Sequence, residues 1–353
     1  MAAPHTSDRY PENPVVVRVY RAGVVESVHR GAWCLADPTG KILASAGDVE
    51  HPTFVRSSIK SIQALPLFES GAAERFRFSD AEVALTISSH AGEPCHTETA
   101  RGALERIGLG VRHLRCGVHP PFDSQTREEL RARGEAPTAL HNNCSGKHVG
   151  FLALAKHLGV APEDYLAPES RGQVLVRRAL AELTDVPERL LVPGVDGCSA
   201  PTYRLPLRAL ATAFARIANP GALAPERRAF AARMTGAAAE HPVLVSGSRK
   251  CLDTDLLAAS GGRLFAKIGA EAVHAIGVVG GGRGLALKID DGGVRGLNTL
   301  VMALLERLEL AGAEELERLA PWRETRLENF AGLEVGRVEA VIEGGTRVRA
   351  VFP

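Results

Sequence analysis

Lysine is scarce in this chain of 353 residues, in which the 42 positively charged side chains are 35 arginines and only 7 lysines. Arginine keeps its proton in proteins, whereas lysine can release its proton and act as a base or a nucleophile. Three of the lysines lie beside serines, cysteines or glycines, in "SSIK", "NCSGKH" and "FAKIGA". Lys60, Lys147 and Lys267 are therefore the first candidates for chemistry.

The chain also lacks an excess of charge and a long apolar run. Its formal net charge is +1, so no basic surface for nucleic acid is expected. No uninterrupted apolar run approaches the roughly 20 residues of a membrane-spanning helix, and "MAAPHTSDRYPENP" lacks the pattern of a secretory signal. We expect a cytoplasmic protein with no nucleic-acid or membrane partner. In a reducing compartment its six cysteines are not expected to form disulfides.

Strand-like and helix-like patterns divide the chain into ends and middle. β-branched runs at 14–48, 263–289 and 335–352 predict strands, with "DPTG", "GGGRG" and "DDGG" as hairpin turns. Apolar periodicity predicts a helix that ends near 310, and further helices at 97–109, 146–159, 171–184, 205–218 and 225–240. We expect an α/β (α+β) fold whose mostly antiparallel sheet is built from both chain ends. The predicted domains are 1–80 with 255–353, which contain the sheet, and a helix-rich insert, 81–254.

Ser57 and Lys60 form the only S-x-x-K pattern, within "FVRSSIKSIQAL". On a helix, side chains three residues apart share a face, so Lys60 can reach the Ser57 hydroxyl and act as its base. Ser57 at a helix start also feels the positive end of the helix dipole. Lys60 must lose its proton near neutral pH, which burial and a second cation favour. The alternative is that Ser57 only caps a helix and Lys60 is solvated.

Two later segments complete a known order of residues. "SSHAG" places Ser89 in a loop, and "KIG" places Lys267 on a strand just before Gly269, where a ligand can approach the backbone. Serine β-lactamases and penicillin-binding proteins have the same order of motifs: S-x-x-K first, then a loop with a serine, then K-x-G on a late strand. The same fold is therefore expected. "SSHAG" and "KIG" depart from the S-D-N and K-T-G of those enzymes.

The stretches "LHNNCSGKHVGFLALAKHLG" and "GVDGCSAPTYRLPL", with the segments above, resemble the serine-lysine L-asparaginase family, often called asparaginase II. The resemblance runs from about residue 16 to 308. It implies hydrolysis of L-asparagine to L-aspartate and ammonia through an acyl-enzyme. It also implies two coupled catalytic pairs, Ser57–Lys60 and Ser89–Lys267. With this family we expect a homodimer whose small-molecule partner is L-asparagine.

The resemblance further implies a zinc ion held by Cys144, Lys147 and Cys198, with Asp196 nearby. Residue spacing alone supports this only weakly, because C-x-x-K is not a standard zinc pattern and an ammonium must lose its proton before it binds metal. By residue type, His148 is the better third ligand. No organic cofactor is expected.

A zwitterionic substrate needs a cation for its α-carboxylate and an anion for its ammonium group. Arg56, Asp196 and Glu93 are the candidates, and His90 and Gly269 complete the expected substrate-binding set. Backbone N–H groups of Ser57 and of the strand after Lys267 are candidates for an oxyanion hole.

Two other functions remain open. The same scaffold can serve another amide or lactam hydrolase, such as a glutaminase or a β-lactamase-like enzyme. A metal-stabilised binding module that has lost its chemistry is the alternative outside the enzymes.

Overall fold

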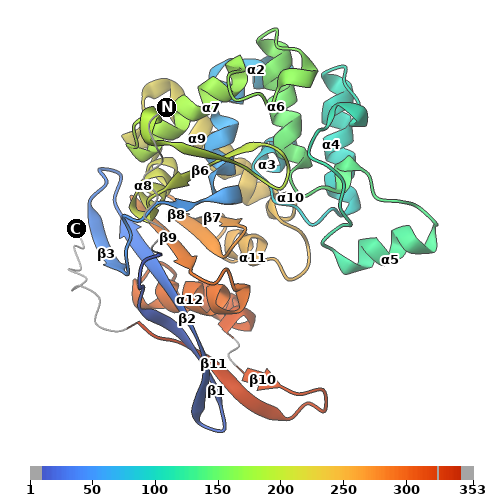
Figure 1. The fold of residues 1–353 in the computed structure, drawn as a ribbon. Coiled ribbons are helices and arrows are strands. Elements are labelled where there is room, and N and C mark those ends of the chain that lie inside the picture. The colour runs from blue at the N-terminus through green and yellow to red at the C-terminus, as the bar shows by residue number, and fades with distance from the viewer. Residues whose placement is uncertain (1–9, 324–325, 343–353) are drawn as a thin grey trace.

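The computed structural model describes residues 10–323 and 326–342 (Figure 1). The strands are β1 (Val15–Arg21), β2 (Val24–Ala36), β3 (Ile42–Ala46), β4 (Thr53–Phe54), β5 (Val192–Val195), β6 (Pro201–Leu205), β7 (Leu264–Gly269), β8 (Val273–Val278), β9 (Arg283–Ile289), β10 (Arg326–Glu328) and β11 (Glu334–Ala340). The α-helices are α1 (Lys60–Glu69), α2 (Ala72–Arg75), α3 (Asp80–Thr86), α4 (Pro94–Arg106), α5 (Ser124–Ala132), α6 (Ser145–His157), α7 (Arg171–Thr184), α8 (Leu207–Ala218), α9 (Pro225–Glu240), α10 (Pro242–Val245), α11 (Leu252–Ala259), α12 (Val294–Arg307) and α13 (Ala313–Arg318). The strand expected at 347–352 lies outside the described residues.

Both ends of the chain build the main sheet. Its order is β10-β11-β1-β2-β9-β8-β7, with β3 paired to β2. All of these pairs are antiparallel, which confirms the predicted α/β architecture. A second sheet, β4-β6-β5, was not predicted, because its strands have only two to five residues.

The predicted turns had different outcomes. "DPTG" joins β2 to β3 and "GGGRG" lies at the turn between β8 and β9, as expected. The prediction of a hairpin at "DDGG" is wrong, because these residues lead from β9 into α12. A turn sequence sets the local bend only, and the apolar periodicity of the next segment makes it a helix.

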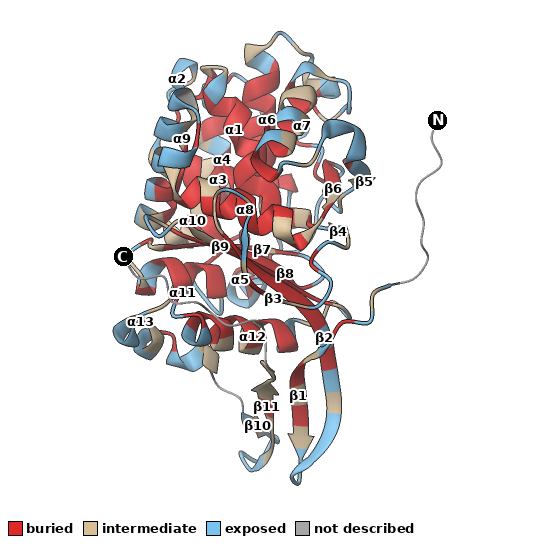
Figure 2. Ribbon diagram, turned by 90° about the vertical axis from the view of Figure 1, so that its left-hand side faces the viewer, coloured by how far each residue is buried: buried red, intermediate tan, exposed pale blue. Residues whose placement is uncertain are grey.

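Helices cover both faces of the sheet. Figure 2 shows a buried helical layer above the strands and α11 and α12 below them. Helix α8 approaches β8 and β9 where Gly277 and Gly284 leave room, since a Cβ on Gly284 would meet the Ala211 carbonyl oxygen at 2.0 Å. The larger apolar core combines sheet residues with residues of the helical insert, whereas the second core lies on the α12 side. The division into two domains therefore stays a prediction.

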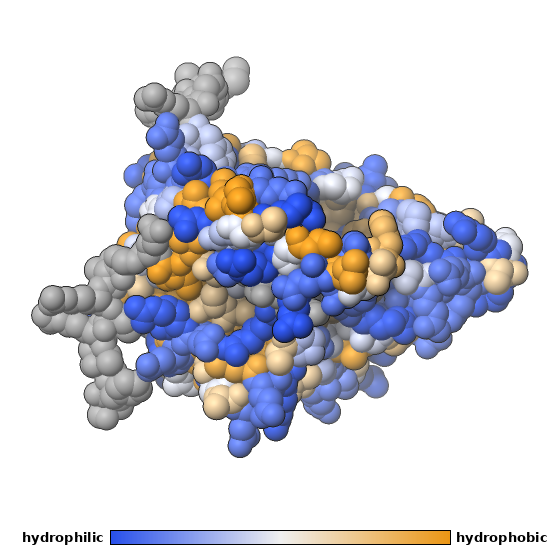
Figure 3. All heavy atoms as spheres, turned by 90° about the horizontal axis from the view of Figure 1, so that it is seen from below, coloured by the Kyte–Doolittle hydropathy of each residue, from blue (hydrophilic) through white to orange (hydrophobic). Residues whose placement is uncertain are grey.

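An arm formed by β1, β2, β10 and β11 extends from the body of the molecule (Figure 1). Its exposed large apolar residues are Val24, Val25, Val28, Phe330 and Leu333. From below, the visible surface is mostly hydrophilic with scattered apolar patches (Figure 3). Among the described residues no helix is long and apolar enough to span a membrane.

Candidate active site

Ser57 lies at a strained entry into helix α1. The chain passes from β4 through a 3-10 turn, η1 (Arg56–Ile59), and Lys60 is the first residue of α1. Arg56 has φ +50°, the left-handed region that a non-glycine residue rarely adopts. Such strain is concentrated at functional sites. Ser57 is 9% exposed, so its hydroxyl lies at the edge of the buried interior.

Lys60 is fully buried, and its amine is directed at the loop that carries Ser88 and Ser89. Its Nζ donates to Ser88 O at 2.5 Å, to Ser89 Oγ at 3.0 Å and to Asn143 O at 3.4 Å. Among the described residues the Lys60 backbone N–H donates to Ser57 O, but no hydrogen bond joins Lys60 Nζ to the Ser57 hydroxyl. The predicted Ser57–Lys60 spacing on one helix is present, but the direct contact of Lys60 is with Ser89.

Ser89 is held from both sides. Its backbone N–H donates to Val245 O at 3.0 Å, while its hydroxyl accepts from Lys60. Ser89 follows α3, whose amino end carries a capping box made by Ser79 and Glu82. The loop that carries Ser89 is therefore fixed before any substrate binds.

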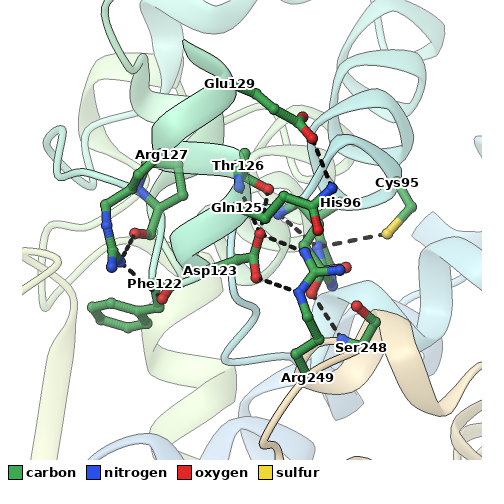
Figure 4. A network of polar contacts seen from close by, with 12 residues as sticks. Cys95, His96, Phe122, Asp123, Gln125, Thr126, Arg127, Glu129, Ser248 and Arg249 are labelled. Carbon is green, nitrogen blue, oxygen red and sulfur yellow. Dashed lines mark hydrogen bonds and ion pairs between the residues drawn. The ribbon is translucent and has the colours of Figure 1, made fainter. Parts of the chain in front are cut away.

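A polar network holds the segment 246–251 that leads into α11 (Figure 4). The Arg249 guanidinium donates to both carboxylate oxygens of Asp123, at 2.8 and 2.6 Å, and it holds the pKa of Asp123 well below its usual range. The Ser248 N–H donates to Glu93 Oε1 at 2.7 Å. Because Glu93 is buried and already accepts this bond, it stabilises the segment 246–251 and does not face a substrate.

Lys267 is a second fully buried lysine, on β7. Its Nζ donates to Ile268 O at 3.0 Å and lies 3.6 Å from Asp253 Oδ2. Burial lowers the pKa of Lys267 to about 8, and nearby Lys60 acts in the same direction, whereas Asp253 opposes both. No hydrogen bond joins Lys267 to Ser89 among the described residues, so this expected pair is not in direct contact.

Gly269 brings β7 against the turn that carries Ser57. A Cβ at Gly269 would meet Val55 O at 2.7 Å and Ser58 N at 3.2 Å, so only glycine allows this approach. The Ile268 N–H already donates to Asp253 Oδ2 at 2.8 Å. An oxyanion hole would therefore use Ser57 N–H with a strand N–H beyond Ile268.

Two cysteines and a lysine converge beside Lys60. Lys147 Nζ lies 3.2 Å from Cys198 Sγ, and the thiols of Cys144 and Cys198 are close enough to hydrogen-bond each other. That hydrogen bond holds the pKa of Cys144 well below its usual range and raises that of Cys198. Burial alone would lower the pKa of Lys147, but the two cysteines and Asp196 outweigh it and raise it.

This donor set fits a zinc ion. The three side chains are buried, and two thiolates with one amine leave a fourth position open for water or substrate. Within residues 10–323 and 326–342 no group of three or more His, Cys, Asp or Glu could hold a metal. All six cysteines are free of disulfides, so Cys144 and Cys198 are available as ligands once their thiols lose their protons.

The remaining expected residues have separate positions. Arg56 Nη2 lies 2.7 Å from Asp196 Oδ1, so two of the three residues predicted to hold the zwitterion already pair with each other. Arg56 also lines an open cavity of about 440 Å³ with Glu271 and Lys288. His90 is buried, and its ring nitrogens contact Gly92 N and Ser145 Oγ.

His148, the alternative ligand by residue type, bonds Tyr165 Oη through Nδ1 at 2.6 Å. Lys147 rather than His148 therefore faces the thiols.

Asp253 and His274 were missed by sequence reasoning. Both are buried, and His274 Nε2 lies 2.7 Å from Asp253 Oδ1. In the sequence Asp253 resembles an ordinary acidic residue in the first turn of a helix, and His274 is one polar residue in an apolar strand. No local signal marks either of them.

Two serines and two buried lysines, of which Lys267 lies on the antiparallel sheet, are the groups that a serine-lysine hydrolase requires. The L-asparaginase II family model matches residues 17–340, and the chain belongs to this family of amidohydrolases. No curated protein matches the chain.

Solved structures show distant similarity. A β-lactamase from Mycobacterium bovis is 16% identical, with TM-score 0.40 over 78% of this chain and 94% of that one. Mglu in its tris and glutamate form is 15% identical, with TM-score 0.38 over 84% of this chain and 63% of that one.

Proposed function

We propose that the protein hydrolyses L-asparagine to L-aspartate and ammonia through a serine acyl-enzyme. The observation that carries the proposal is the pair of fully buried lysines, Lys60 and Lys267, beside Ser89 and the Ser57 turn. A positive charge on one lysine makes it harder for the other lysine in the same pocket to keep its proton, so at least one of the two amines can be neutral near physiological pH. A neutral buried amine is the base that a serine nucleophile needs.

Ser57 is the proposed nucleophile. Its Oγ attacks the side-chain amide carbon, its proton passes to Lys60, and the Ser57 N–H stabilises the oxyanion. The Lys60–Ser89 hydrogen bond then offers a route for that proton to the departing nitrogen, so the C–N bond breaks and ammonia leaves. Water hydrolyses the ester by the reverse proton path, which releases aspartate and restores Ser57.

Arg56 and Asp196 supply the charges that an α-amino acid needs. Their ion pair is only partly exposed, with side chains 25% and 10% accessible. A bound zwitterion can place its carboxylate against Arg56 and its ammonium against Asp196, which replaces one charge pair by two. An amide without the α-amino and α-carboxylate groups cannot make this exchange.

We also propose that Cys144, Lys147 and Cys198 hold zinc. Bound there, zinc would supply a positive centre that orients the substrate and joins the turns around Cys144 and Cys198. The serine-lysine chemistry itself needs no Lewis acid. Lys147 must give up its proton on metal binding, so zinc uptake should release protons.

Steady-state ammonia release with asparagine and with glutamine, alongside turnover of nitrocefin, tests the activity. Asparagine should have the highest kcat/KM. Faster glutamine turnover would make the enzyme a glutaminase, and nitrocefin turnover alone a β-lactamase-like enzyme. Acylation by none of the three would leave the metal-stabilised binding module. A homodimer remains our proposal for the assembly, which sedimentation can test.

A further inference from the structure

Behind Lys267 lies a buried carboxylate that the proposed chemistry does not use. Asp253 enters from α11 and His274 from β8, and both side chains are fully buried. Asp253 Oδ2 lies 3.6 Å from Lys267 Nζ, beyond an ordinary hydrogen bond. Burying a carboxylate is costly unless it is paired, so its three contacts need an explanation.

The Asp253 carboxylate is held away from Lys267 by two shorter contacts. Oδ1 lies 2.7 Å from His274 Nε2, and Oδ2 accepts the Ile268 N–H at 2.8 Å. Since a carboxylate can only accept, His274 donates its Nε2–H. His274 Nδ1 has no partner among the described residues, so the bond to Asp253 is what orients the ring.

We propose that Asp253, held by His274 and by the Ile268 N–H, is a positioning residue that fixes the Lys267 amine and sets how tightly it holds its proton. The role of that amine in turnover rests on the proposed function. A closer carboxylate would make Lys267 hold its proton more tightly, whereas loss of the carboxylate would make it release the proton more easily. The restrained distance of 3.6 Å lies between these extremes.

The titratable groups around Lys267 agree with this role. Asp253 is the anion beside the amine and also binds His274, while Lys60 and Cys144 are the other titratable groups that act on Lys267. Burial alone would raise the pKa of Asp253, but the hydrogen bond from His274 and the nearby Lys267 amine lower it to about 2. Asp253 is therefore charged at neutral pH.

The test is a direct titration of Lys267 in the full-length protein. With only seven lysines, ¹³C labelling at lysine Cε gives few NMR signals, and a Lys267→Arg variant assigns the one of interest. In Asp253→Asn the midpoint should fall by about one pH unit or more, because the ammonium loses its anion. Asp255→Asn removes an exposed charge from the same helix and should leave the midpoint unchanged.

His274→Leu should shift the Lys267 midpoint in the opposite direction, and this variant tests the proposal if Asp253→Asn does not fold. Without the histidine, Asp253 can turn towards Lys267, so the midpoint should rise. The rising limb of the rate against pH should move with the midpoint in each variant. An unchanged midpoint in Asp253→Asn, or a fall in His274→Leu, would overturn the assignment. Shifted midpoints in a protein that hydrolyses no amide would support it while rejecting the proposed function.

Discussion

Lys147 and Lys267 are both buried lysines, yet their environments drive their protons in opposite directions. Lys147 lies 3.2 Å from Cys198 Sγ, with Cys144 and Asp196 nearby, and these groups raise its pKa. Burial dominates at Lys267 and lowers its pKa to about 8. Burial alone therefore does not decide the protonation of a lysine, because the number and distance of the anions around it can reverse the effect.

The difference indicates separate tasks for two adjoining pockets: the serine-lysine pocket of Ser57, Lys60, Ser89 and Lys267, and the thiol pocket of Cys144, Lys147 and Cys198. An amine that titrates near neutral pH can move protons during catalysis. An amine surrounded by thiols and a carboxylate stays charged until a metal cation takes the place of its proton. After Cys198, Lys60 is among the groups that hold the pKa of Cys144 low, so the pocket of Cys144, Lys147 and Cys198 adjoins the pocket of Lys60 and Lys267.

The largest expected effect is a loss of kcat when the serine nucleophile or its lysine base is removed. Ser57→Ala and Lys60→Met should each lower kcat by on the order of 10⁴-fold or more, because nucleophile and base act as one unit. Zinc content and circular dichroism should stay as in the wild type. More than a few per cent of activity in Ser57→Ala would move the nucleophile to Ser89.

Changes in the thiol pocket should act on binding. Cys144→Ser and Cys198→Ser should weaken zinc binding by about 10–100-fold or more, and raise KM more than they lower kcat. Metal analysis by mass spectrometry and kinetics after chelation measure this, with Cys251→Ser as the control thiol. Loss of the chemical step at saturating asparagine would make the metal catalytic. Active wild type without metal would remove the site.

Gly269→Ala should disturb the serine-lysine pocket and spare the thiol pocket. The added methyl would meet Val55 O at 2.7 Å, which pushes β7 away from the Ser57 turn. We expect kcat to fall by about tenfold to 100-fold with zinc content unchanged. Gly236→Ala, in α9 with no atom within 4 Å of the new methyl, is the matched control. Equal kinetics in both variants would contradict the close approach.

The smallest expected effect is a shift along the pH axis. Wild-type kcat/KM should rise with pH, with an apparent pKa near 8 that belongs to the coupled lysines. In Lys267→Met the pH at which the residual activity rises should move up by about one unit, because Lys60 no longer has a second amine beside it. A rate that does not vary between about pH 6 and about pH 10 in the wild type would contradict lysine as the base.

The predictions that depend only on residues close together in the sequence were the ones confirmed. The strands at both chain ends and the five central helices follow from apolar periodicity, and α7 begins and ends as predicted. "DDGG" failed because a turn does not specify whether a strand or a helix follows it. The direct contact of Lys60 with Ser89 was not predictable from spacing, since Ser89 reaches it from a loop 29 residues away.

By itself the sequence determined the chemistry that is available: a serine three residues before a lysine at a helix start, a second serine-lysine set, and two cysteines with a lysine. It also determined the antiparallel sheet built from both ends, because alternation and periodicity are local properties of the chain. Only the tertiary structure decided how the lysines differ. The loop after α3 faces Lys60, the cysteines converge on Lys147, and the packing of α11 on β7 brings Asp253 to both Lys267 and His274. Proton affinity depends on charges within a few ångströms, and those neighbours come from distant parts of the chain.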